Sequence, residues 1–116
     1  MPSRITPPTL PEATYHYLGL FGVRARQSDF ERAEKLFHQA LGRVRRPEDI
    51  RAALALDTRR LLPVQLKSPL YERLMSLVGR SPRLLREYAQ EMYDFGPEFK
   101  PYADDLWDEA NRLESA

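Results

Sequence analysis

The chain has 116 residues, enough for one domain with a hydrophobic core, and its 42% apolar and 30% charged residues are ordinary for a globular protein. Its 18 Lys and Arg against 17 Asp and Glu give a formal net charge of +1, and no stretch approaches the roughly 18 apolar residues of a membrane span, so we expect no membrane association. The absence of cysteine excludes disulfides, thiolate metal sites and a cysteine nucleophile, and it is typical of a reducing compartment, so a cytoplasmic protein is expected.

The first nine residues contain three prolines, which restrict the backbone to extended conformations and predict an N-terminal arm over residues 1–9. A single helical domain is expected over residues 10–116. Thr9 and Glu12 have the spacing of a capping box, in which each side chain accepts a hydrogen bond from the backbone of the other. They predict a first helix over residues 10–26.

Two further helices are predicted before the middle of the chain. Ser28 and Glu31 form a second capping box, and we expect the helix that it opens to end before Gly42, because glycine readily adopts the left-handed conformation that follows a helix. Pro47 suits the first turn of a third helix, where its missing N–H would have no partner. Pro63 would remove an N–H from the helix interior and is expected to end this helix.

The second half of the chain predicts three more helices. The Ser-Pro pairs at 68–69 and 81–82 combine an N-cap residue with a proline at the first helical position, and so predict two helix starts. Gly79 and Gly96 are expected to end these two helices. A last helix with a proline in its first turn is predicted over residues 101–113, which gives six helices in three pairs.

The apolar residues have the spacing of helices rather than of strands. They recur at three- and four-residue steps in three stripes: Phe30, Ala33, Phe37, Ala40 and Leu41; Leu85, Tyr88, Ala89, Met92 and Phe95; and Ala103, Leu106, Trp107, Ala110 and Leu113. No segment alternates apolar and polar residues between the turn residues of a hairpin. The predicted fold class is therefore all-α.

Similar residues return with a period of 34, the length of a helix–turn–helix repeat. The dipeptides that recur are Leu20-Phe21, Leu54-Ala55 and Tyr88-Ala89. The residues around them in the first and third units are Tyr17, Ala33, Phe37 and Ala40, and Leu85, Met92, Ala103, Trp107 and Ala110. This pattern resembles the tetratricopeptide repeat (TPR) family. The resemblance implies a TPR-like α-solenoid of about six helices, whose stacked units present a binding surface.

The resemblance is imperfect at identifiable positions. Phe21 and Arg24 stand where the family pattern has Gly and Tyr. The middle unit lacks the Ala-x3-Phe pattern and has a longer connector at residues 62–67. The third unit carries two extra residues near Gly96. The middle unit is therefore the weakest of the three.

In the TPR family a target peptide lies in a concave groove lined by the first helix of each unit. Carried over by position, the residues that we predict to bind a partner are Tyr15, Leu18, Arg26, Leu56, Arg59, Arg60, Arg83, Arg86, Gln90 and Tyr93. The set is apolar in the first unit and rich in arginine in the others. We therefore expect a scaffold or adaptor module that binds an acidic, partly apolar peptide or protein segment. The paired Asn and Lys of the carboxylate-clamp subfamily are missing.

Catalysis has little support in the sequence. His16 and His38 are the only histidines, and neither has a second metal ligand at helical spacing. The carboxylates within residues 104–109 could bind a hard cation, but the dipole near a helix start also favours them. No glycine-rich phosphate loop and no nucleophile or metalloprotease motif occurs. We expect no enzyme activity, no cofactor and no metal site.

The charge distribution leaves alternatives open. Residues 24–86, the basic segment, carry 15 Lys and Arg against 7 Asp and Glu, whereas residues 87–116, the acidic segment, carry 2 against 9. The two segments could simply attract each other across the fold. The arginines could instead bind the phosphates of a nucleic acid, with Tyr or Phe stacked on its bases. A homo-oligomeric structural protein, such as a homodimer formed through the last helix, is the remaining alternative.

Overall fold

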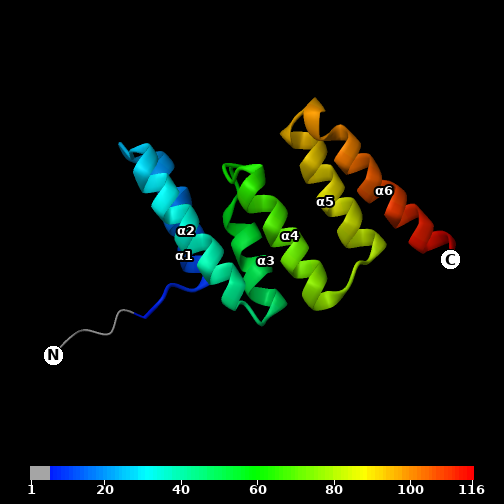
Figure 1. Ribbon diagram of the computed structural model, residues 1–116, viewed down its shortest axis with the longest axis horizontal. Helices are drawn as coiled ribbons and strands as arrows, with labels where there is room; N and C mark the ends of the chain where they lie inside the picture. The colour runs from blue at the N-terminus through cyan, green and yellow to red at the C-terminus, as the bar shows by residue number, and fades with distance from the viewer. Residues whose placement is uncertain (1–5) are drawn as a thin grey trace. The chain divides into compact units, whose positions relative to one another are not determined.

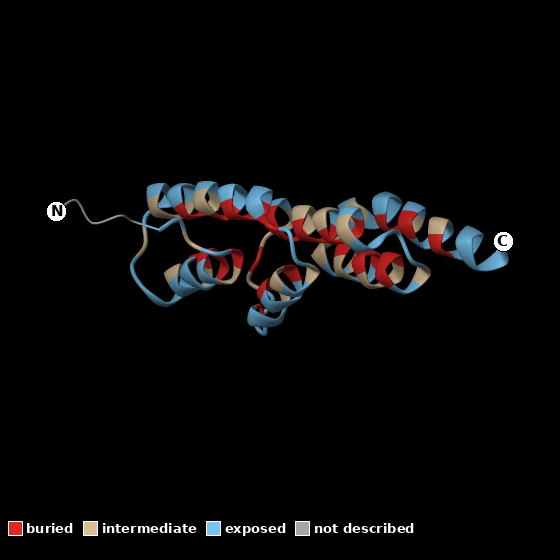
Figure 2. Cartoon of the chain, turned by 90° about the horizontal axis from the view of Figure 1, so that it is seen from below, coloured by how far each residue is buried: buried red, intermediate tan, exposed pale blue. Residues whose placement is uncertain are grey.

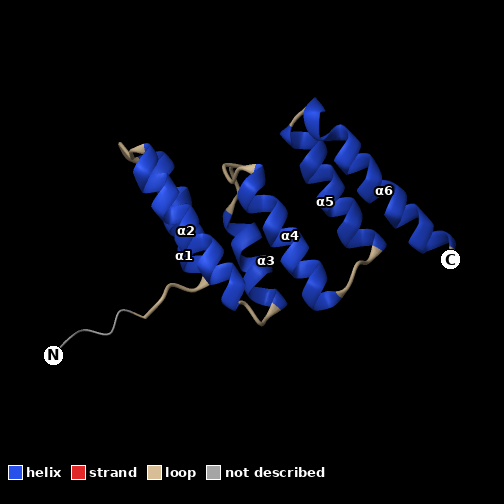
Figure 3. Cartoon of the chain, in the orientation of Figure 1, coloured by secondary structure: helices blue, strands red, loops and turns tan. Residues whose placement is uncertain are grey.

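The computed structural model describes residues 6–116, and its regular elements are all helical (Figure 3). The predicted all-α class and the count of six α-helices are confirmed over these residues, which contain no strand. Residues 6–9 of the predicted arm are outside any helix, and its first five residues lie outside the described part. None of the described helices has both the length and the apolar content that a membrane span requires.

The chain divides into two compact units, of which the first ends at Leu66 and the second begins at Lys67. In Figure 1 the first unit is coloured from blue to green and the second from green to red. The expectation of a single domain over residues 10–116 stays a prediction.

The first unit contains three α-helices and a short 3-10 turn. These are α1 (Leu10–Gly19), η1 (Leu20–Gly22), α2 (Gln27–Arg43) and α3 (Pro47–Leu56). Helix α1 packs against both α2 and α3. Each helix contributes one alanine that is at most 2% exposed, Ala13, Ala33 and Ala53, and Phe37 on α2 has no exposed surface. Small side chains let neighbouring helix backbones approach, and the large ones fill the remaining volume.

Helix α1 begins where the sequence predicts. The Glu12 N–H donates to Thr9 Oγ1 at 3.2 Å, and the Thr9 N–H donates to Glu12 Oε1 at 3.1 Å, which completes the capping box. The predicted continuation to residue 26 is wrong, because η1 follows Gly19 and the backbone is extended at Val23. Two glycines, at 19 and 22, weaken the helix here, since each costs about 1 kcal/mol relative to alanine in a helix interior.

Both predicted ends of α2 need correction. Arg26, not Ser28, is the N-cap residue, and the Asp29 carboxylate accepts a hydrogen bond from the Arg26 N–H at 2.9 Å. Gly42 lies inside the helix rather than after it. The chain leaves the helix at Val44, whose backbone is extended and whose side chain is buried. Burial of this apolar side chain therefore coincides with the helix end.

Helix α3 starts at Pro47 as predicted but ends at Leu56, well before Pro63. The buried Asp57 carboxylate accepts hydrogen bonds from the N–H groups of Leu61 at 2.6 Å and Leu62 at 3.1 Å. An aspartate that bonds nearby backbone groups in this way competes with helix continuation. A loop therefore occupies the place of the predicted last turns of the helix.

Helix α4 (Val64–Val78) begins five residues before the predicted start at Pro69. Pro69 lies inside the helix, and the preceding Ser68 is not its cap. The Ser68 hydroxyl instead hydrogen-bonds to the Tyr88 hydroxyl. The first residues of α4 belong to the first unit and the rest, from Lys67, to the second.

The remaining elements of the second unit are α5 (Pro82–Phe95), η2 (Pro97–Phe99) and α6 (Lys100–Ser115), and α5 packs against α6. Ser81 caps α5 as predicted, since its hydroxyl oxygen accepts from the Leu84 N–H at 3.2 Å. Gly79 and Gly96 end their helices as predicted, with φ angles of 95° and 144° that side chains rarely allow.

Most of the predicted apolar stripes lie in the core, and each helix carries its buried residues along one side (Figure 2). Two residues of the last stripe do not, since Trp107 and Leu113 are 39% and 44% exposed. Trp107 therefore does not play the part of Phe37, its counterpart in the repeat pattern. Its ring lies under the guanidinium of Arg86 instead, 5.3 Å from the ring centre.

Candidate partner-binding surfaces

The apolar residues of the predicted binding set are accessible in the first unit. Tyr15 on α1 is 72% exposed, Leu56 at the end of α3 is exposed, and Leu18 is half-buried. The buried side chains of α1 lie on its other face, and they include Tyr17. Tyr15 and Leu56 thus offer apolar surface that the unit itself does not cover.

The arginines predicted for the first unit are exposed but do not lie on helix faces. Arg26 immediately precedes α2, and Arg59 and Arg60 lie in the loop after α3. Their assignment to a helical register was wrong because α1 and α3 end earlier than expected. Arg60 has a positive φ of 54°, so the loop turns sharply there.

The residues predicted on α5 fall into two groups. Arg83 and Gln90 are exposed, and Gln90 donates to Asp94 Oδ1 at 3.2 Å on the same helix. Arg86 and Tyr93 are only partly exposed and bind side chains of α6. Two of the four side chains are therefore engaged by α6, and the other two are exposed.

Arg86 links α5 to the end of α6. Its Nη2 donates to Asn111 Oδ1 at 2.9 Å and forms an ion pair with Glu114. The hydrogen bond from Arg86 lowers the pKa of the Glu114 carboxyl below its ordinary value. With Trp107 beneath it as well, this guanidinium has three contacts on α6.

Tyr93 is used in a similar way. Its hydroxyl donates to the Asp104 carboxylate, which also accepts from Lys100 Nζ at 2.8 Å. The hydrogen bond to this carboxylate raises the pKa of Tyr93 to about 12. The cation on Lys100 and the hydroxyl together lower the pKa of Asp104. Asp104, a residue of the acidic cluster weighed as a cation site, is thus occupied by neighbours.

A second arginine outside the predicted set also meets the acidic segment. Arg80 donates from Nε and Nη2 to the two carboxylate oxygens of Glu109, at 2.6 and 2.8 Å, and its Nη1 lies 3.7 Å from Glu72. This bidentate geometry is the strong form of the arginine–carboxylate pair. In the second unit, therefore, part of the basic segment and part of the acidic segment neutralise each other.

A tyrosine cluster in the second unit is centred on the buried Tyr88. Tyr88 is fully buried, stacks on Tyr71 at 5.0 Å between ring centres, and shares hydrogen bonds with the hydroxyls of Ser68 and Tyr102. Burial raises the pKa of Tyr88 above its ordinary value. The Tyr71 hydroxyl donates to Glu87 Oε2 at 2.9 Å, so each hydroxyl of the cluster has a hydrogen-bond partner.

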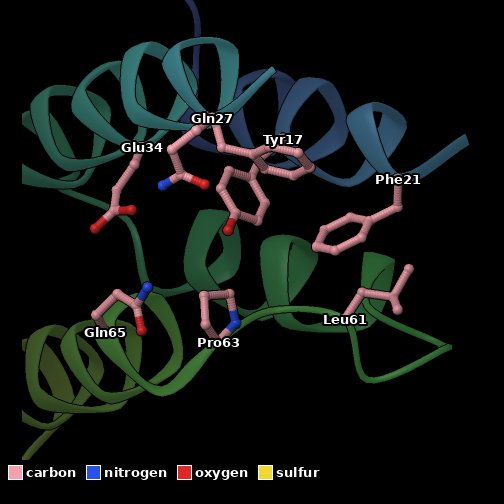
Figure 4. A pocket seen from close by; sticks show the side chains of 8 residues that line it. Tyr17, Phe21, Gln27, Glu34, Leu61, Pro63 and Gln65 are labelled. Carbon is pink, nitrogen blue, oxygen red and sulfur yellow. The ribbon is translucent and has the colours of Figure 1, made fainter. Parts of the chain in front are cut away.

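A pocket in the first unit was missed by the sequence analysis. It has a volume of about 410 Å³ and is lined by Tyr17, Phe21, Gln27, Phe30, Glu34, Leu61, Pro63 and Gln65 (Figure 4). None of these residues belongs to the predicted binding set. The aromatic residue at position 21, where the TPR pattern has glycine, was the available signal.

Comparisons with known proteins add no relative to these observations. No family model, no curated protein and no solved structure matches the chain. The TPR resemblance therefore stays a prediction from the sequence.

Proposed function

We propose that this chain is a protein–protein interaction module, a scaffold or adaptor, that binds an acidic, partly apolar peptide or protein segment. The observation that carries the proposal is the exposure of Arg26, Arg59 and Arg83 from the predicted set. None of these three side chains forms an ion pair with a carboxylate within residues 6–116. Such guanidinium groups suit bidentate recognition of carboxylates.

The apolar part of the proposed ligand is supported by the exposed Tyr15 and Leu56 of the first unit. Tyrosine and arginine are enriched among the residues that dominate binding energy at protein interfaces. The packing of α1 on α2 and of α5 on α6 agrees with helix pairs of a TPR-like α-solenoid, and a cytoplasmic location is part of the proposal.

The test is a selection of binders from a random-peptide display library. We expect enriched peptides to combine Asp or Glu with apolar residues. The triple variant Arg26→Glu, Arg59→Glu, Arg83→Glu should bind these peptides with at least tenfold lower affinity. Its helical content, measured by circular dichroism, should be unchanged. Arg86 is left intact because its substitution would also loosen α6.

The matched control is Arg32→Glu, Lys35→Glu, Arg45→Glu, which makes the same charge change at exposed positions outside the predicted set. This control should keep the selected peptides. Enrichment of sequences without acidic residues, or equal loss in both triple variants, would show that these arginines do not bind the ligand as proposed.

Self-association is a second candidate function, favoured by the exposed Tyr102, Trp107 and Leu113 of α6. Large apolar residues on one terminal helix can pair with the same helix of a second copy. Light scattering after gel filtration separates a monomer from a dimer. A dimer that Trp107→Glu dissociates would support this candidate, and a monomer at all concentrations would exclude it.

A further inference from the structure

The pocket in the first unit has one apolar end and one polar end. Phe21 and Leu61 lie at one end in Figure 4, and Glu34 and Gln65 lie at the other, with Tyr17 between them. A ligand that fills such a pocket needs an apolar part and a polar head. The volume of about 410 Å³ is within the range of small-molecule sites.

Three aromatic rings form one wall. Tyr17, Phe21 and Phe30 make edge-to-face contacts with one another, with ring centres 5.8, 5.5 and 5.1 Å apart. Tyr17 is buried, whereas Phe21 is 45% exposed and Phe30 is half-buried. The cluster is thus held in the core by Tyr17 and is accessible to a ligand at Phe21 and Phe30.

Glu34 is the one charged side chain among the residues that line the pocket. Gln27 and Gln65 add amide oxygens that can accept hydrogen bonds. The nearest cationic partner of Glu34 is His38, whose Nε2 lies 3.8 Å away and is charged only when protonated. The polar end therefore combines one carboxylate with hydrogen-bond acceptors.

We propose that this pocket binds an organic cation on an apolar stem, specifically an alkylguanidinium group such as an arginine side chain. The planar guanidinium pairs with a carboxylate and stacks on aromatic faces, and it is more weakly hydrated than an ammonium. The Glu34 carboxylate would accept hydrogen bonds from the guanidinium N–H groups, and the stem would lie along Phe21 and Leu61. The carboxylate selects a positively charged ligand, and the aromatic rings select a planar group on an apolar stem.

This inference does not depend on the proposed function. The acidic peptide ligand of the proposed function would contact exposed arginines, whereas no arginine lines the pocket. The two sites carry opposite charges, so each can fail without the other.

The direct test is an NMR titration of the full chain with n-butylguanidine, followed at Tyr17, Phe21 and Phe30. We expect saturable shifts of these three residues. The control ligand is n-butylurea, which has nearly the same shape and no charge, and it should bind at least tenfold more weakly. Equal binding of the two ligands, or no saturation by either, would overturn the proposal.

Two variants separate the contributions of charge and rings. Glu34→Gln keeps the volume of the side chain and should lower the affinity for n-butylguanidine at least tenfold. Glu31→Gln, on the exposed side of the same helix, should leave it unchanged. Phe21→Leu keeps an apolar side chain at an exposed position and should weaken binding severalfold through the loss of the ring. Unchanged affinity in Glu34→Gln would refute the assignment of the carboxylate.

A final comparison identifies the source of the cation. The blocked tripeptide acetyl-Gly-Arg-Gly-amide is titrated beside n-butylguanidine, with its citrulline analogue as the neutral control. Tripeptide binding that exceeds binding of the citrulline analogue supports an arginine side chain of a partner. Binding of n-butylguanidine alone supports a free small molecule, and failure of both refutes the inference.

Discussion

Asp57 shows how one side chain can redirect the backbone. Its carboxylate binds the N–H groups of Leu61 and Leu62, and these bonds hold the loop that replaces the last turns of α3. Arg59 and Arg60 owe their positions to this loop. A residue that looks like an ordinary helix position in the sequence thus moves two predicted binding residues off the helix.

We predict that Asp57→Ala lowers the free energy of unfolding by about 1–3 kcal/mol, because it leaves buried backbone donors without a partner. Urea denaturation followed by circular dichroism measures the change. Gln39→Ala, at an exposed position on α2, serves as control and should stay within about 0.5 kcal/mol of the wild type. Similar stability of both variants would mean that the loop does not need the carboxylate.

At the scale of a helix, α6 is held to its neighbours by polar contacts as well as by its buried alanines. Arg86 contacts Asn111 and Glu114 near the end of α6 and Trp107 at its middle, and Arg80 contacts Glu109 between them. The last turns of a helix fray unless something holds them. The contacts of Arg86 are therefore expected to order the end of α6.

Arg86→Gln should speed amide hydrogen exchange at residues 111–115 several-fold, because the ion pair and the stacking on Trp107 are both lost. Arg83→Gln is the matched control, since Arg83 lies on the same helix and is exposed. Exchange is measured by NMR on both variants. Equal protection of residues 111–115 in wild type and Arg86→Gln would contradict the role assigned to this side chain.

The pair of Arg80 and Glu109 predicts a pH dependence. The hydrogen bonds from Arg80 lower the pKa of Glu109 below the ordinary 4.5. A carboxyl whose pKa is lowered by folding stabilises the protein at pH values above its ordinary pKa. This stabilisation is lost as the pH falls through the pKa of the folded state. The wild type should thus be more stable than Arg80→Gln at neutral pH, and the difference should shrink below pH 4.5.

Urea denaturation of the wild type and Arg80→Gln at neutral pH and under acid conditions measures this change. Arg83→Gln is again the control and should follow the wild type at both pH values. A difference between wild type and Arg80→Gln that is the same at both pH values would show that Glu109 is not the partner that titrates.

How far the sequence predicts these elements depends on whether the local signal agrees with the packing around it. Ser81 caps α5 as expected, with its hydroxyl oxygen on the Leu84 N–H, whereas the Ser68 hydroxyl bonds Tyr88 from another helix. Gly96 ends a helix as expected, but Gly42 does not. Residue type alone carries no information on these longer-range contacts.

The candidate sites were less predictable than the helices. Carrying a groove over by position assumes a helical register, and that register was lost after Leu56. The pocket was missed because its walls come from segments far apart in the chain, of which Phe21 and Leu61 are examples. Only the folded chain brings such residues together.

At the scale of the whole molecule, the net charge of +1 does not determine the affinity of the chain for a polyanion such as nucleic acid. In the second unit, Arg80 and Arg86 are paired with carboxylates of α6. A phosphate backbone would have to compete with these carboxylates for both guanidinium groups. The paired arginines are therefore expected to contribute little to binding of nucleic acid.

We predict weak binding of a single-stranded oligonucleotide, with a shallow dependence on salt. Affinity for nucleic acid falls steeply between about 50 and 200 mM salt when several phosphates are neutralised, so the slope counts the arginines that take part. Fluorescence anisotropy at several salt concentrations gives this slope for the wild type and for the double variant Glu109→Gln, Glu114→Gln. The variant removes the α6 carboxylates that pair with Arg80 and Arg86. It should therefore bind the oligonucleotide more tightly, with a steeper slope. A steep slope in the wild type that the variant does not change would instead favour nucleic-acid binding through the other arginines, and would count against the adaptor function.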